Sequence, residues 1–161
     1  MTADEIRQTL ASSREQLLET IKGVTEEQFK RRPADGSWCI AEVLAHQLVA
    51  EKIWAERVRL ALEHDGAAIE PIDQEAADAQ ARAGRTSPVP QLIHGLLAAR
   101  REIEKLVDEA ESIEGGFERA AVHPATGRQT VAMMLGEQIS PHEMEHVEQI
   151  ESLKGTVTTN P

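Results

Sequence analysis

The chain has 161 residues, a net charge of -11, and a composition of 40% hydrophobic and 28% charged residues. This length and balance predict one globular domain and exclude a disordered chain. An acidic surface repels phosphate backbones, which argues against nucleic-acid binding. No apolar run approaches the roughly 20 residues that a membrane span needs, and the single cysteine, Cys39, fits a reducing compartment. We therefore expect a cytoplasmic protein without nucleic-acid or membrane partners.

The first expected helix covers residues 3–22. Thr2 and Glu5 have the spacing of a capping box, in which two side chains satisfy free backbone N–H groups. Apolar residues follow at spacings of four and seven, so one stripe of this helix is expected to face a core. Thr25 is expected to start a short further helical turn, and the stretch around Gly36 is expected to be a loop.

Two further long helices are expected in the middle of the chain. One covers residues 38–64 with Ser37 as its N-cap, and the other covers residues 88–110 with Ser87 as its N-cap. Both carry apolar residues at helical spacing. The connector between them is long enough to hold a short helix over residues 73–83.

The fourth expected helix covers residues 131–154, with Thr130 as N-cap and Gly155 as its C-terminal stop. Residues 156–161 are expected to form a flexible tail after a single domain of residues 1–155. No segment alternates apolar and polar residues strongly enough to predict a sheet. Four helices with one apolar stripe each predict an all-α four-helix bundle, and the long connectors permit crossover connections.

Two histidines of the last helix share one face. His142 and His146 are four residues apart, which stacks their side chains along the helix. Their neighbours on that face are apolar: Leu135, Ile139, Ile150 and Leu153. Adjacent buried imidazoles without partners are costly, and one metal ion would satisfy both. The alternative is a pair of hydrogen-bonded core histidines, or a half-exposed pair at the rim of the bundle.

His46 is the candidate for a third ligand. It lies on an apolar stripe of the second long helix, near Val43 and Ile53. A single core histidine is more often structural than a ligand. However, three protein ligands with one open position are the usual pattern of a catalytic metal site, and bundles build such sites from facing helices. The sequence therefore predicts one divalent metal ion held by His46, His142 and His146.

The other three histidines are expected outside this site. His64 lies about 27 Å from His46 along the helix and is expected at that helix's C-terminus. His94 falls off the apolar stripe of its helix and is expected at the boundary or on the surface. His123 stands beside Pro124 in an expected loop, where it is most simply solvated.

Residues 142–146 read His-Glu-Met-Glu-His and fit the H-E-x-x-H signature of zinc proteases, as well as its inverted form. The extended protease motif needs a glycine and a third histidine downstream, where this chain has Gln149 and Ser152. We therefore set proteolysis aside. Glu143 and Glu145 are expected on a solvated flank of the helix; the alternative is a role in orienting a ligand or relaying a proton.

Pro141 stands directly before the histidine pair. It removes one backbone hydrogen bond, so the helix is expected either to bend there, which would aim His142 at the metal, or to restart with Ser140 as a new cap. Cys39 is expected to be a small buried side chain rather than a ligand or nucleophile.

Three motifs resemble the DinB-like (DinB/YfiT) superfamily. The segment Gly36–His46 resembles the start of the second helix of that family, where a tryptophan precedes an apolar run that ends in a metal-ligand histidine. The segment His142–His146 followed by Gln149 and Ile150 resembles the closing motif, and Arg128–Val131 resembles the usual entry to the last helix. The match covers the whole chain in length and order.

This resemblance implies a four-helix bundle with a long crossover, frequent homodimers, and a site for zinc, nickel or a similar ion on His46, His142 and His146. Characterised relatives include transferases and isomerases that use a low-molecular-weight thiol such as bacillithiol or mycothiol. The implied function is a thiol-dependent S-transferase that acts on small electrophiles. The alternatives are a metal-dependent hydrolase, a non-catalytic module that binds a metal or small molecule, and a structural dimer.

Overall fold

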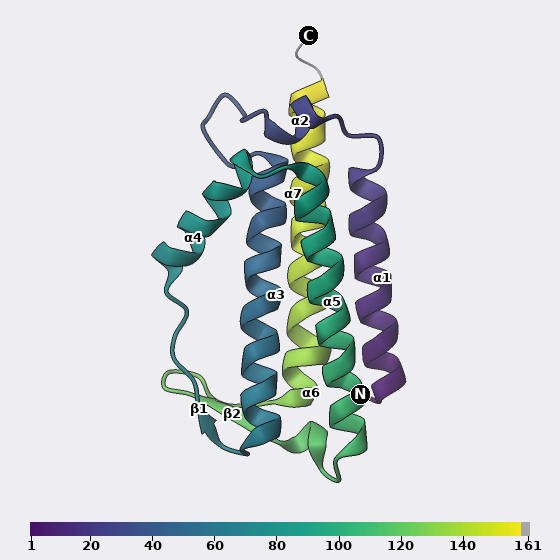
Figure 1. The fold of residues 1–161 in the computed structure, drawn as a ribbon, viewed down its shortest axis with the longest axis vertical. Helices are drawn as coiled ribbons and strands as arrows, with labels where there is room; N and C mark the ends of the chain where they lie inside the picture. The colour runs from purple at the N-terminus through teal and green to yellow at the C-terminus, as the bar shows by residue number, and fades with distance from the viewer. Residues whose placement is uncertain (159–161) are drawn as a thin grey trace.

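A computed structural model describes residues 1–158. Four long helices stand side by side, the last of them in three parts (Figure 1). Their bounds are α1 Ala3–Ile21, α3 Ile40–Glu63, α5 Val89–Ser112, α6 Val131–Met133, the π-helical η3 Met134–Gln138, and α7 Ile139–Thr158. The shorter elements are α2 Glu26–Lys30, α4 Gln74–Ala83, η1 Gly84–Thr86, η2 Gly116–Glu118, β1 Ala67–Ala68, β2 Ala120–His123 and β3 Gly127–Thr130. The predicted four-helix bundle is confirmed.

The long helices run up, down, down and up in chain order (Figure 1). The short helix α2 joins α1 to α3 at the top. After α3, the segment that contains α4 carries the chain back up along the outer side of α3 to the start of α5. This return is the long crossover. As a result α1 lies parallel to α7 and α3 lies parallel to α5, and these two pairs make the most extensive helix–helix contacts.

Several predicted N-caps are confirmed. Thr2 and Glu5 form the capping box of α1, and Thr25 caps α2. Thr130, also predicted, accepts the backbone N–H of Met133 at the start of α6. Asp73, which is not among the predicted caps, accepts the backbone N–H of Ala76 at the start of α4. Each of these bonds satisfies a donor that the first turn of a helix leaves free.

The predicted cap of α3 is wrong. The helix begins at Ile40, and the Glu42 carboxylate accepts the Cys39 backbone N–H at 3.1 Å. The same carboxylate binds the Arg32 guanidinium through two N–H groups, at 3.1 and 2.9 Å. Ser37 donates its hydroxyl to Asp35 instead. A buried carboxylate at the helix start therefore replaces the expected hydroxyl cap.

The ends of α5 and α7 also differ from the prediction. α5 begins at Val89, so Pro88 and not Ser87 precedes its first turn. α7 continues through Gly155 to Thr158, so the predicted stop is wrong. The remaining residues of the predicted tail, 159–161, lie outside the described residues.

A small sheet closes the lower end of the bundle (Figure 1), although none is predicted. β2 and β3 form an antiparallel hairpin with His123 opposite Gly127, and β1 pairs with β2 in parallel. In the turn, Nδ1 of His123 accepts the N–H groups of Ala125 and Thr126, and Gly127 takes a φ of +77°. The strands are too short for an alternating pattern to reveal them, and the hairpin fills the connector between α5 and α7.

The core has two apolar clusters with a charged layer between them. The lower cluster contains Leu10, Val58, Ile103 and Ile139, and the upper cluster contains Leu17, Leu44, Leu96 and Ile150. The side chains between the clusters are Arg14, Glu51, Arg100 and Glu143, all of them buried. We refer to these four residues as the charged layer.

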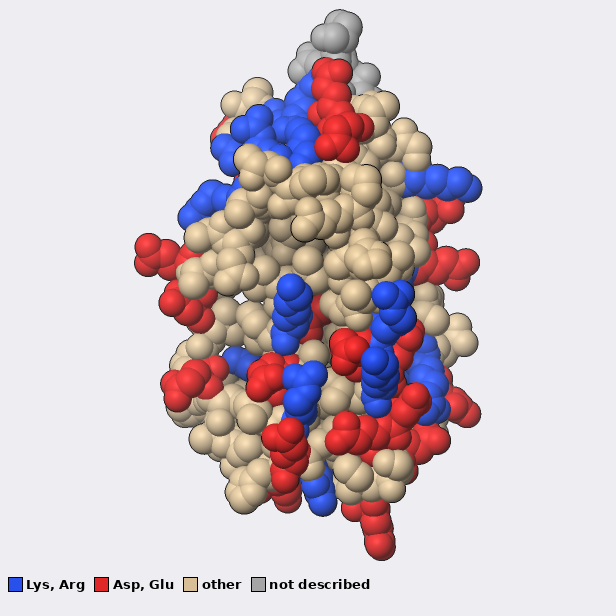
Figure 2. All heavy atoms as spheres, viewed as in Figure 1, with Lys and Arg blue, Asp and Glu red and all other residues tan. Residues whose placement is uncertain are grey.

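The surface is unevenly charged. Figure 2 shows charged side chains crowding the lower half of one face and a broad uncharged area above them, over the first half of α5. No helix within residues 1–158 combines the length and apolarity that a membrane crossing requires.

Gly84 lets the η1 turn approach α3 closely. A Cβ added there would lie 2.3 Å from Cβ of Ala45 and 3.0 Å from the carbonyl oxygen of Ala41. We expect Gly84→Ala to lower the free energy of unfolding by about 1–3 kcal/mol, measured by urea denaturation. Gly155→Ala is the control, because nothing lies within 4 Å of its added Cβ, and its expected gain is at most about 1 kcal/mol. Equal effects of the two substitutions would contradict the close packing.

Candidate metal centre

The three histidines predicted as ligands come together in space. His46 extends from α3, and His142 and His146 extend from α7; one ring nitrogen of each lies within 4.8 Å of the other two. The Nε2 atoms of His142 and His146 are 3.2 Å apart. Three imidazole nitrogens that converge on one point from two helices are a donor set that suits one divalent ion.

A π-helical segment leads into the histidine pair. Pro141 lies in the first turn of α7 and cannot donate a backbone hydrogen bond. The five residues of η3 directly before α7 are π-helical, and such a segment takes up a break in the regular ladder. Ser140 does not cap a new helix, because its hydroxyl has no hydrogen-bond partner within the described part of the chain. The chain therefore passes from α6 through η3 into α7 without a new cap, so the second of the two expected alternatives, a restart at Ser140, is not observed.

Neighbouring side chains orient two of the rings. Oε1 of Gln149 lies 3.0 Å from Nδ1 of His146. A proton on Nδ1 makes this a hydrogen bond and leaves the Nε2 lone pair directed at the Nε2 of His142. The Trp38 ring packs against His46, with the ring centroids 5.1 Å apart.

The surroundings keep all three histidines neutral. Burial, followed by the nearby His146 and His46, lowers the pKa of His142 to about 4, against an opposing effect of Glu143. Burial and then His146 also lower the pKa of His46, against an opposing effect of Asp78. The pKa of His146 is lowered by burial, against the opposing hydrogen bond of Gln149. Neutral imidazole is the form that binds metals, so the site is in its ligand form at pH 7.

One buried nitrogen of the site lacks a partner. Nδ1 of His46 makes no hydrogen bond with any residue from 1 to 158. Buried polar atoms are normally satisfied, and an exception needs an explanation such as a bound ion or water. The three-histidine site therefore fits a group bound between α3 and α7.

Glu143 departs most from the prediction. The sequence predicts a solvated side chain, but Glu143 is 0% exposed. It accepts hydrogen bonds from Ser13, Arg14 and Arg100 at 2.7, 2.8 and 2.9 Å. Glu145 is exposed, as predicted. The two glutamates of the His-Glu-Met-Glu-His segment thus lie in opposite environments.

The charged layer joins all four long helices at the level of Glu143. Arg14 binds Glu143 and also Glu51, the latter at 2.6 Å, and Arg100 binds the same two carboxylates. Both guanidinium groups also donate to backbone carbonyls, those of Leu96 and Leu10. Two positive and two negative charges cancel, which is the condition under which buried charges are tolerated.

The remaining histidines and the cysteine lie outside the site. His64 is the exposed C-cap of α3, and His94 is exposed on α5, both as predicted. His123 is half-buried at the end of β2 rather than in a loop. Cys39 is fully buried, and burial raises the pKa of its thiol, which agrees with its predicted role as a small buried side chain.

The chain is similar to known proteins in sequence and in fold. A family model described as the DinB superfamily matches residues 6–150. The uncharacterized protein YuaE of Bacillus subtilis (strain 168) is 28% identical over 149 residues, covering 83% of this chain and 88% of YuaE. The structure of YfiT from Bacillus subtilis, described as a probable metal-dependent hydrolase with an unusual four-helix bundle topology, matches with a TM-score of 0.76 at 21% identity, over 95% of this chain and 86% of YfiT. TT2238, described as a four-helix bundle protein, matches with a TM-score of 0.64 at 19% identity, over 94% of this chain and 99% of TT2238.

Glu143→Gln tests the charged layer. Arg14 and Arg100 would lose a buried partner of opposite charge, so the free energy of unfolding is expected to fall by about 3–5 kcal/mol. Glu145→Gln makes the same chemical change on the exposed side of the helix and is expected to stay within about 0.5 kcal/mol of the parent. Chemical denaturation of both variants gives the two values. A loss for Glu143→Gln no larger than for its control would show that the layer is dispensable.

Proposed function

The chain belongs to the DinB superfamily, and from this premise we propose that it is a divalent-metal-dependent enzyme that acts on small molecules at His46, His142 and His146. The convergence of three neutral imidazoles within 4.8 Å is the observation that carries the proposal. Three protein donors leave a further position open for a substrate. Zinc or nickel is the proposed ion, because imidazole nitrogen suits both.

Each residue of the site has a part in this proposal. His46 would hold the ion from α3, and His142 and His146 would hold it from α7. When bound, the ion would supply Lewis acidity that deprotonates a coordinated thiol or water at neutral pH. Gln149 keeps His146 in the tautomer with a free Nε2 lone pair, and Trp38 supports the ring of His46.

A low-molecular-weight thiol is the proposed co-substrate. The three-histidine group contains no carboxylate, and Glu143 is bound within the charged layer, so neither offers a general base to water. A thiol that binds such an ion is deprotonated outright, whereas the pKa of a zinc-bound water is about 7 to 9, so a water would need a nearby base more than a thiol does. In the proposed S-transfer, the sulfur forms a bond to a carbon of a small electrophile. The leaving group departs with the electron pair of the broken bond, and the thiol proton passes to solvent.

Metal-dependent hydrolysis is the second candidate. It is favoured by the fold that this chain shares with YfiT, whose description names a probable metal-dependent hydrolase. The homodimer that the resemblance implies stays a prediction.

The metal site is tested by metal content. Purified protein incubated with zinc or nickel and then desalted is expected to retain about one ion per chain, measured by elemental mass spectrometry. His46→Ala and His142→Ala are each expected to lose the ion, because each removes one of three donors. His94→Ala removes an exposed histidine of α5 and is expected to retain it. Retention by His142→Ala, in a protein with unchanged circular dichroism, would contradict the three-histidine site.

Thiol dependence is tested by turnover. Metal-loaded protein is mixed with monochlorobimane and bacillithiol, mycothiol or cysteine, and formation of the fluorescent thioether is followed. We expect at least one thiol to react about tenfold faster than without protein, and His46→Ala to abolish the gain. Hydrolysis of a nitrophenyl ester without any thiol, together with no thioether formation, would favour the second candidate over the first.

A further inference from the structure

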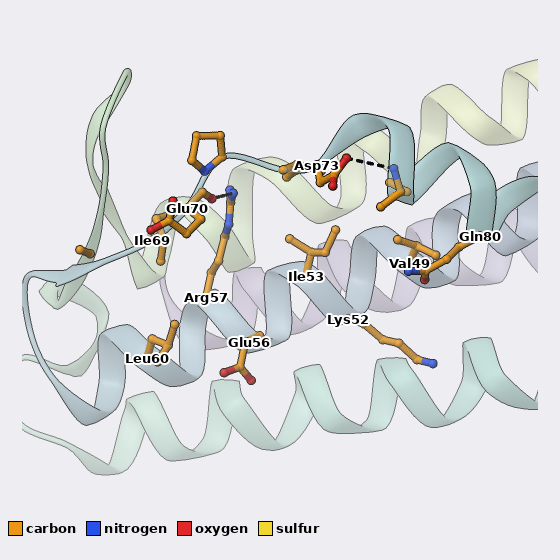
Figure 3. Close-up of a pocket in the computed structure, with 15 residues that line it drawn as sticks. Val49, Lys52, Ile53, Glu56, Arg57, Leu60, Ile69, Glu70, Asp73 and Gln80 are labelled. Atoms are coloured by element: carbon orange, nitrogen blue, oxygen red, sulfur yellow. Dashed lines mark hydrogen bonds between the residues drawn. The ribbon is translucent and has the colours of Figure 1, made fainter.

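A pocket of about 560 Å³ lies beside α3 (Figure 3), and none of the three histidines lines it. One wall is a stripe of α3 that includes Val49, Ile53 and Leu60. The other wall is the chain segment of residues 68–73 that leads into α4, together with Ala77 of α4 itself. The volume lies in the range of small-molecule binding sites, and the lining is mainly apolar, as in such sites.

Arg57 is the unusual residue of this pocket. Its side chain points across the pocket to Glu70, whose carbonyl oxygen accepts an N–H from Nη2 at 2.8 Å (Figure 3). The guanidinium carbon lies 5.3 Å from the ring centroid of Trp54, and the residue is only 6% exposed. Within residues 1–158 no carboxylate forms an ion pair with Arg57, whereas the buried Arg14 and Arg100 each bind two. A buried arginine without an acidic partner is rare.

The acidic residues around the pocket do not compensate this charge. Glu56 points to the other side of α3 and pairs with Arg59 at 2.6 Å. Asp73 accepts a backbone N–H at the start of α4, and the side chain of Glu70 is exposed to solvent. Burial lowers the pKa of Arg57, as expected for a cation without a nearby anion. The guanidinium therefore has no carboxylate in direct contact, and the hydrogen bond to Glu70 leaves it further N–H donors for a ligand in the pocket.

We propose that this pocket binds a small amphiphilic carboxylate, with Arg57 holding the carboxylate group and the stripe of α3 covering the apolar body. A guanidinium fork matches the two oxygens of a carboxylate. A single negative charge balances the single charge of Arg57. A doubly charged phosphate would leave one charge unmatched on a chain with a net charge of -11. The apolar stripe from Arg57 to Val49 extends about 12 Å, which suits a chain of roughly eight carbons.

This binding site is independent of the proposed metal but close to it. Val49, at one end of the pocket, is three residues from His46, so the two sites are about one helical turn apart on α3. The far end of a bound carboxylate would therefore lie near the three histidines. Binding itself rests only on the pocket and Arg57, so His142→Ala is expected to bind the carboxylate as the parent does.

The test uses three probes of equal length: octanoate, octanol and octylamine. Binding is followed by isothermal titration calorimetry with the full chain. Octanoate is expected to bind about tenfold or more tightly than either of the other probes, because only it pairs with Arg57. Arg57→Gln is expected to abolish this preference and leave octanol binding unchanged. Arg57→Lys keeps the charge and is expected to retain part of the preference.

Arg59→Gln is the matched control. It removes the same charge two residues away on α3, but Arg59 does not line the pocket and pairs with Glu56, so the octanoate preference is expected to survive. Equal binding of octanoate and octanol by the parent would overturn the proposal, and so would an unchanged preference in Arg57→Gln or no binding of any probe. If Arg57→Gln fails to fold, as judged by circular dichroism, the comparison of probes on the parent and on Arg59→Gln still decides. Loss of binding in His142→Ala would instead tie the pocket to the metal site.

Discussion

The charged layer fixes how the four helices stand against one another. Apolar side chains tolerate small shifts along a helix, whereas charged hydrogen bonds must stay near 3 Å to compensate for buried charge. Each helix therefore has one position along its axis at which all the ion pairs of the layer form. The layer also sets the height of the histidines, because Glu143 is next to His142 in α7 and Glu51 lies on the same helix as His46. The three imidazoles are held level with one another by a network that contains none of them.

Such a layer contributes more to specificity than to stability. Within the described residues, Oε2 of Glu51 and Nε of Arg100 are buried without hydrogen-bond partners, and each has lost its hydration. A well-packed apolar layer of the same volume is often equally stable or more so. It would, however, allow the helices to slide. For a site built from two helices, the fixed register is the more useful property, and this explains charges placed between two apolar clusters.

Local signals made much of the fold and site predictable, and distant contacts account for what was missed. Helical periodicity and capping residues predict the four long helices, and the spacing of His142 and His146 predicts their shared face. The charged layer escapes prediction because Arg14 interrupts the apolar stripe of α1 between Leu10 and Leu17, which does not reveal a partner. Its partners Glu51 and Glu143 lie 37 and 129 residues away in the sequence. The hairpin escapes because its strands have four residues each. A charged residue on an otherwise apolar stripe is the signal that would have found the layer.

The parallel pairing of α1 with α7 has a consequence for how the chain acquires its structure. The two helices come from opposite ends of the sequence and share one of the largest interfaces. Contacts between residues so distant in sequence form late, because the entropy cost of closing the intervening chain into a loop must be overcome first. During synthesis α1 is made before α7, so it lacks its main packing partner until α7 has been synthesised. His142 and His146 lie on that same helix, so the imidazole cluster cannot form before α7 packs, and a nascent chain without α7 has only His46 of the three.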